Sequence, residues 1–140
     1  MDDNANAAVE IHDSTLECIT SDGDALVAVL GAYVHRSSGR PGIDAGTGWS
    51  QTVHLRFLRG RASGDEGMVP MGLLDGHLDV SGERFNNMFP MPFNRIGPTR
   101  IELQGWNGIR IVIEGEGVMA AFVGEARYIE KFLASESRTP

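Results

Sequence analysis

The residues best suited to acid–base or metal chemistry are four widely spaced histidines. They are His12, His35, His54 and His77. The closest two lie 19 positions apart, so the chain carries no local metal motif such as His-Glu-x-x-His. A catalytic or metal site built on these histidines would have to assemble through the fold, so strand pairing decides whether one exists.

A turn at Asp22-Gly23 predicts how the first two strands pair. Asp-Gly favours a tight hairpin, in which residues whose numbers sum to about 45–47 face each other. This register places His12 near His35, and Asp13 or Asp44 could add a carboxylate for zinc binding or hydrolysis. A metal-dependent or hydrolytic enzyme that uses His12, His35 and Asp44 is therefore the alternative function. A one-residue slip would separate these side chains, and we favour two surface histidines at strand ends.

The run Ile11-His12-Asp13-Ser14 contains the letters of a hydrolase triad. Neighbours in a strand alternate faces, so these side chains cannot converge unless the backbone kinks. We expect Asp13 or Ser14 to cap a turn or a strand. Cys18 lies on an apolar strand face in a segment that has no basic residue, which predicts an inert thiol. We therefore predict no catalytic residue, no metal and no cofactor.

A glycine-rich segment, residues 36–48, is the main candidate for binding. Its thirteen residues include four glycines and one proline, which indicates a loop. Arginine and aromatic side chains, which anchor binding surfaces, lie in it and beside it. The candidate partner- or ligand-binding residues are Tyr33, His35, Arg36, Arg40, Asp44 and Trp49. The alternative is a structural Ω-loop in which Arg40 pairs with Asp44 and Trp49 fills the core.

The charge of the chain is concentrated at its start. Residues 1–35 hold seven acidic residues and no lysine or arginine, whereas the other 105 residues hold twelve of each sign. The net charge of −7 therefore comes from the first quarter of the chain. Nucleic acid is not expected as a partner, because the densest basic cluster is only Arg56, Arg59 and Arg61. The acidic segment suits a basic protein partner, or it is simply solvated.

Alternation and turn residues predict a mainly β protein. Ala25–His35 is apolar on both faces, which indicates a central strand. Asn107-Gly108 indicates a hairpin, and Glu125–Ala134 has the spacing of a short helix. The predicted fold is an antiparallel sandwich or partly closed barrel of about seven or eight strands with one short C-terminal helix. Further strands are expected at Thr15–Thr20, Trp49–Leu58, Thr99–Gln104, Ile109–Glu114 and Val118–Val123.

The length of 140 residues suits one domain, with residues 1–10 as a mobile acidic tail and 11–140 as a single β domain. One cysteine excludes an internal disulfide. No apolar run approaches the length of a membrane span, and the acidic start does not look like a secretory signal, so we expect a cytoplasmic protein that does not engage a membrane.

Methionine and phenylalanine are frequent between residues 68 and 93. They could form a pliable surface for a partner, but we favour a core beneath a long loop. The set comprises Met68, Met71, Phe85, Met88, Phe89, Met91 and Phe93.

Four segments together resemble a family of small uncharacterised bacterial proteins. They are Ile-His-Asp-Ser-x-Leu at 11–16, Ala-Tyr-Val-His-Arg-Ser-x-Gly-x-Pro-Gly at 32–42, Gly-Thr-Gly-Trp at 46–49 and Gly-Glu-Ala-Arg-Tyr-Ile-Glu-x-Phe at 124–132. The resemblance implies no activity and no site residue. Some small bacterial β-proteins of this size are immunity partners of toxins, which is an analogy of size and acidity only.

The sequence thus favours a non-enzymatic β-domain that binds a protein or a small molecule through residues 36–49. A homodimer that hides a strand edge is a further expectation.

Overall fold

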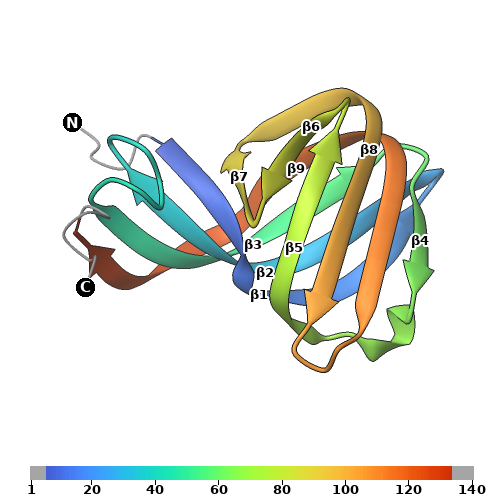
Figure 1. Cartoon of the computed structure of the whole chain (residues 1–140), viewed down its shortest axis with the longest axis horizontal. Helices are drawn as coiled ribbons and strands as arrows, with labels where there is room; N and C mark the ends of the chain where they lie inside the picture. Colours follow the sequence, from blue (N-terminus) through green and yellow to red (C-terminus); the bar gives the residue numbers. More distant parts are fainter. Residues whose placement is uncertain (1–5, 134–140) are drawn as a thin grey trace.

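The computed structural model describes residues 6–133, except for the side chain of Glu66, and shows an antiparallel β protein (Figure 1). The mainly antiparallel β class is confirmed, with nine strands rather than seven or eight. The strands are β1 (Asn6–Asp22), β2 (Ala25–Ser37), β3 (Gly46–Phe57), β4 (Arg61–Gly64), β5 (Met71–Val80), β6 (Glu83–Asn86), β7 (Met88–Met91), β8 (Phe93–Gly105) and β9 (Arg110–Phe132). A short 3-10 turn, η1 (Glu66–Met68), precedes β5.

All nine strands belong to one sheet that partly curls into a ring. The order along the sheet is β6-β5-β8-β9-β3-β2-β1-β7, and β4 pairs with β9. Two further residue pairs, Thr15 with Gly72 and Leu16 with Met71, join β1 back to β5. Six strands therefore follow one another around the ring.

The ends of four strands continue beyond the ring and form an extension. The start of β1, the end of β2, the start of β3 and the end of β9 project together to the left in Figure 1. The short strand β7 pairs with the start of β1 there. The extension carries the chain segments in which the sequence placed the binding residues.

Alternation along the strands builds the core. β2 lies between β1 and β3, which confirms the prediction of a central strand. One set of alternating side chains along β2, namely Leu30, Ala32 and Val34, is fully shielded from solvent and continues into the extension. The same core includes Phe89 and Met91 of β7, so β7, which pairs with β1, adds side chains to the inner face of the extension.

A kink in β1 lets the strand pass from the extension into the ring. Between Glu10 and Thr15 the strand holds four residues where β2 has only Ala32, and Asp13 has a positive φ of 75°. Aspartate tolerates this left-handed conformation better than most residues. The buried hydroxyl of Ser14 donates to the Glu10 carbonyl and accepts the N–H of Tyr33. The expected turn-stabilising role of Ser14 is thus confirmed.

The expected helix at Glu125–Ala134 is wrong. Residues up to Phe132 belong to β9, and no α-helix occurs in the part of the chain that the structure describes; Ala134 lies outside it. Two bulges interrupt the pairing of β9 with β3. Gln51 of β3 faces residues 124–126 of β9, and Ile129 is an extra residue between two paired positions. The single extra residue at Ile129 shifts the period-2 alternation by one position, which produces apolar spacing that resembles a helix.

Residues 6–10 are not part of a tail. They form the first part of β1, and Ala7, Ala8 and Val9 are buried between β2 and β7. Residues 1–5 lie outside the described part. Within 6–133, no helix has the length and apolar character needed to span a membrane.

Candidate functional site

The predicted loop is shorter and better fixed than its glycine content indicated. The ladder between β2 and β3 continues to Ser37 and Gly46, so only residues 38–45 lie between the strands. Ser37 closes the base of this segment, with its hydroxyl donating to the Ala45 carbonyl and accepting the Gly39 N–H. We call residues 38–45 the β2–β3 loop.

An ion pair holds the β2–β3 loop in shape. The Arg40 side chain lies 3.1 and 3.2 Å from the two carboxylate oxygens of Asp44, whose Oδ2 also accepts the Arg40 backbone N–H at 2.7 Å. The Arg40 hydrogen bonds and charge hold the pKa of Asp44 below its usual range. This is the pairing expected of a structural Ω-loop. Arg40 and Asp44 therefore shape the loop rather than converge with the other candidate residues.

A pocket of about 450 Å³ lies between the β2–β3 loop and the start of β1. Its walls come from three segments that are distant in sequence: the loop, β1 and β7. The lining residues include Pro41 and Ile43 of the loop, Ala8 of β1, and Met88, Phe89 and Pro90 of β7. The pocket is thus largely apolar, although it opens onto a polar surface.

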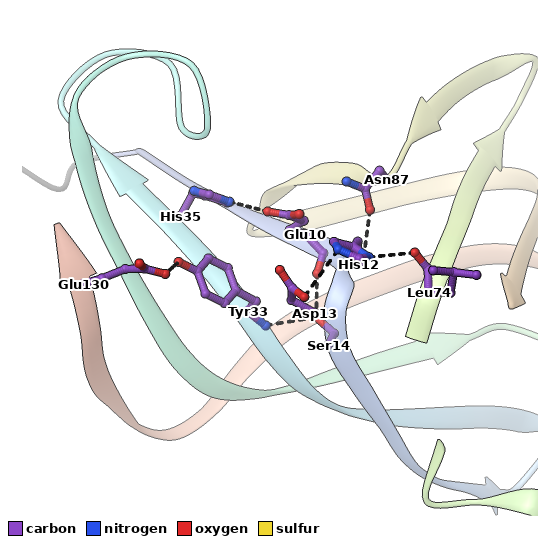
Figure 2. A network of polar contacts seen from close by, with 9 residues as sticks. All are labelled: Glu10, His12, Asp13, Ser14, Tyr33, His35, Leu74, Asn87 and Glu130. Carbon is purple, nitrogen blue, oxygen red and sulfur yellow. Dashed lines mark hydrogen bonds and ion pairs between the residues drawn. The ribbon is translucent and has the colours of Figure 1, made fainter. Parts of the chain in front are cut away.

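That polar surface begins with a contact between Glu10 and His35, 2.6 Å from Oε1 to Nε2 (Figure 2). Strand pairing puts both residues beside the pocket, because Ala8 pairs with His35 and Met88 pairs with Glu10. Both side chains are largely shielded from solvent. A hydrogen-bonded acid and imidazole therefore border the apolar pocket.

Opposing effects act on the carboxyl of Glu10. Burial raises its pKa, but hydrogen bonds from His35 and Asn87 and the charge of His35 outweigh burial and leave the pKa below 4.5. Unfolding releases the carboxyl from these partners, so protonation is easier in the unfolded chain. The ionised Glu10 thus stabilises the fold at pH values above 4.5.

We expect this contribution to disappear in acid. As pH falls from 6 through 4.5 and then through the lower folded pKa of Glu10, the difference in unfolding free energy between wild type and Glu10→Gln should shrink. Urea denaturation at several pH values measures this difference. Asp44 and Asp79 also have lowered pKa values, but they are common to both proteins and cancel. If the unfolding free energies of the two proteins changed with pH in parallel, the proposed stabilising role of the ionised Glu10 would be contradicted.

Tyr33 links the same surface to the end of β9. Its hydroxyl donates to Glu130 at 2.6 Å, and its ring lies 5.0 Å from that of His35 and 6.4 Å from that of Phe132. Burial, the hydrogen bond to Glu130 and the charges of Glu130, Glu10 and Asp13 raise the pKa of Tyr33. Tyr33 therefore stays protonated and donates into an acidic surface, as Figure 2 shows.

The six candidate residues fall into three groups. Tyr33 and His35 face outward beside the pocket, and Arg40 and Asp44 lie within the loop. Arg36 and Trp49 lie on the opposite face of the sheet, where the Arg36 guanidinium carbon is 6.0 Å from the Trp49 ring centroid. The six therefore do not form a single site.

The residues of the alternative enzyme site are also separate in their contacts. His35 contacts Glu10, Asp44 contacts Arg40, and His12 donates to the Leu74 carbonyl at 2.8 Å. The predicted register holds between the kink and the turn, where Thr15 pairs with Gly31 and Asp22 with Ala25, but beyond the kink His35 pairs with Ala8 and not near His12. Within residues 6–133, no group of three or more histidine, cysteine, aspartate or glutamate side chains could hold a metal ion.

The kink brings the side chains of His12 and Asp13 close together, but these two residues and Ser14 do not form a catalytic triad. His12 Nε2 lies 3.4 Å from the Asp13 carboxylate, whereas the Ser14 hydroxyl is buried and bonded to backbone groups. A nucleophilic hydroxyl needs a neighbouring base and access to substrate, and Ser14 has neither.

Sequence reasoning missed Glu10, Ala8 and Met88 as neighbours of the loop. The Met- and Phe-rich set was a usable signal, since its members divide between core and surface. Met71, Phe89, Met91 and Phe93 belong to the core, while Met88 lines the pocket.

No protein-family model, curated protein or solved structure matches this chain.

Proposed function

We propose that the protein is a non-enzymatic binding domain whose ligand site is the pocket between the β2–β3 loop, β1 and β7. The observation that carries this proposal is the pocket itself, with a volume of about 450 Å³ beside a loop that is fixed by its own contacts. Ligand pockets in proteins have volumes of about 300–1,000 Å³, are mostly apolar and contain a few polar groups.

The lining indicates an apolar ligand group. Pro41, Ile43 and Pro90 give rigid apolar walls, whereas Met88 is unbranched and adapts its shape to an occupant. The Met88 methyl lies close to the backbone of Gly42, which brings the loop against β7. An apolar side chain of a partner protein and a compact apolar molecule both have this chemistry.

The charges beside the pocket favour a positively charged partner. Glu10, Asp13 and Glu130 all act on the Tyr33 hydroxyl, so three carboxylates lie near one point on the outer face. The chain as a whole carries a net charge of −7. A basic protein that inserts an apolar side chain would suit this surface, as an immunity-like role would require.

A neutral apolar fluorophore tests whether the pocket binds. We expect N-phenyl-1-naphthylamine to show a saturable rise in fluorescence with the wild-type protein. Ile43→Glu should weaken the affinity at least about tenfold, because a charged group would have to be desolvated at the pocket wall. Ile43 is 42% exposed, so the folded chain should tolerate the change.

The matched control is Ile96→Glu, which puts the same charge at a 73% exposed isoleucine of β8 that does not line the pocket. It should bind the fluorophore as the wild type does. No saturable binding by the wild type, or equal losses in the two variants, would refute the proposal.

A further inference from the structure

The guanidinium of Arg36 is held between aromatic rings on the inner face of the extension. Its central carbon lies 5.0 Å from the centroid of Phe122 and 6.0 Å from that of Trp49. One of its N–H groups donates to Gln51 Oε1 at 2.9 Å. Gln51 is itself fixed, since its amide donates to the Gly124 carbonyl at 2.8 Å. The arginine is therefore preorganised.

Arg36 has no carboxylate partner among residues 6–133. Seven other arginines lie within 4.0 Å of an acidic side chain: Arg40, Arg56, Arg59, Arg84, Arg95, Arg100 and Arg110. Arg61 and Arg127 lack such a contact but are exposed, whereas Arg36 is half-buried. Within the described residues, Arg36 is thus the one half-buried arginine without a carboxylate partner, and partial burial of an unpaired charge costs free energy that a bound anion would offset.

We propose that Arg36 binds the carboxylate of a small aromatic acid. A guanidinium presents five N–H donors in a plane and pairs with a carboxylate through two parallel hydrogen bonds. One donor serves Gln51, so donors remain for a ligand. A carboxylate carries one negative charge and is matched by one guanidinium, whereas a phosphate dianion needs further positive charge.

The aromatic part of the ligand is inferred from the surroundings. Trp49 and Phe122 flank the guanidinium, and the exposed Tyr128 packs edge-on against Trp49 at 5.4 Å. An aromatic body would gain apolar and ring contacts there that acetate cannot make. This site lies on the opposite face from the outward-facing His35 and Tyr33, and it does not depend on the pocket proposed above.

Titration with sodium benzoate at constant ionic strength tests the site in the unaltered protein. In ¹⁵N–¹H spectra, the Nε–H signal of Arg36 should shift saturably, while that of Arg127 should not. Acetate should bind about tenfold more weakly, benzyl alcohol should leave the Arg36 signal unshifted, and inorganic phosphate should bind more weakly than benzoate. No saturable shift at Arg36, an equal shift with benzyl alcohol, or phosphate binding as tight as benzoate would overturn the proposal.

Variants give an independent readout by calorimetry. Arg36→Gln should lower benzoate affinity at least about tenfold, and Arg36→Lys should lose most of that affinity because lysine keeps the charge but lacks the planar fork. Arg127→Gln, which removes an exposed arginine that has no acidic partner among residues 6–133, should bind benzoate normally. Equal affinities for wild type and Arg36→Gln, or an equal loss in Arg127→Gln, would also overturn it.

Discussion

Replacement of Gly46 by alanine is expected to destabilise the protein by about 3 kcal/mol, at the upper end of the range for overpacked sites. A Cβ at this position would overlap the carbonyl oxygen of Arg36 and approach the Ser37 Cβ to 3.1 Å. Both neighbours belong to the ladder in which Gly46 pairs with Ser37. The backbone cannot move away without breaking this ladder, so the end of the β2–β3 loop should open.

Urea denaturation measures the loss, and Gly72→Ala is the matched control. A Cβ at Gly72 would meet only the Trp106 Cδ1 at 3.5 Å, which is ordinary contact. We expect Gly72→Ala to change the unfolding free energy by less than about 1 kcal/mol. Similar stabilities for the two variants would show that the close pairing of the strands at Gly46 is not as described.

Truncation of Phe89 to alanine should cost about 3–5 kcal/mol, the range for a fully buried phenylalanine. Phe89 is 1% exposed and packs edge-on against Phe93, with ring centroids 6.2 Å apart and an interplanar angle of 67°. Phe89 belongs to the core and is also among the residues that line the pocket, so truncation would leave a core void beside the pocket. Phe89→Leu keeps most of the volume and should lose less than about 1.5 kcal/mol.

Stabilisation by a bound ligand distinguishes the void left by Phe89→Ala from a void elsewhere in the core. At one fixed saturating concentration, N-phenyl-1-naphthylamine should stabilise Phe89→Ala more than it stabilises wild type, by about 1.4 kcal/mol for each tenfold gain in affinity. Leu78→Ala is the control, because Leu78 is fully buried in the core but does not line the pocket. The fluorophore should stabilise Leu78→Ala no more than it stabilises wild type. A greater rescue of Leu78→Ala than of Phe89→Ala would place the binding cavity elsewhere.

Local patterns were sufficient for the strands that pair with sequence neighbours. Ala25–His35 is the central strand β2, and the Asp22-Gly23 and Asn107-Gly108 turns join β1 to β2 and β8 to β9. Residues 6–10 could not be assigned in this way. Ala7, Ala8 and Val9 are held by β7, which lies about 80 residues further along the chain, and composition carries no information about such a partner.

Backbone irregularities account for the wrong predictions. The kink at Asp13 changes the pairing of β1 with β2, which moves His12 toward Leu74 and leaves His35 beside Glu10. The extra residue at Ile129 of β9 imitates helical spacing. Gly46 and Gly48 suggested a loop, but both lie in β3, where they allow close approach of the Arg36 carbonyl and the Tyr33 hydroxyl.

Local sequence patterns also could not predict all the walls of the candidate pocket. The loop that the sequence indicated as a binding segment borders this pocket, yet it supplies only one wall. Met88 and Pro90 reach the pocket because β7 pairs with β1, and that pairing has no local signature.

Intermolecular nuclear Overhauser effects between N-phenyl-1-naphthylamine and methyl-labelled protein test the central claim most directly. The account predicts contacts from the fluorophore to the methyl groups of Ala8, Ile43 and Met88, which line the pocket from three separate segments. Contacts to methyl groups elsewhere, such as those of Ile96 or Val123, with none to the three pocket residues, would contradict it.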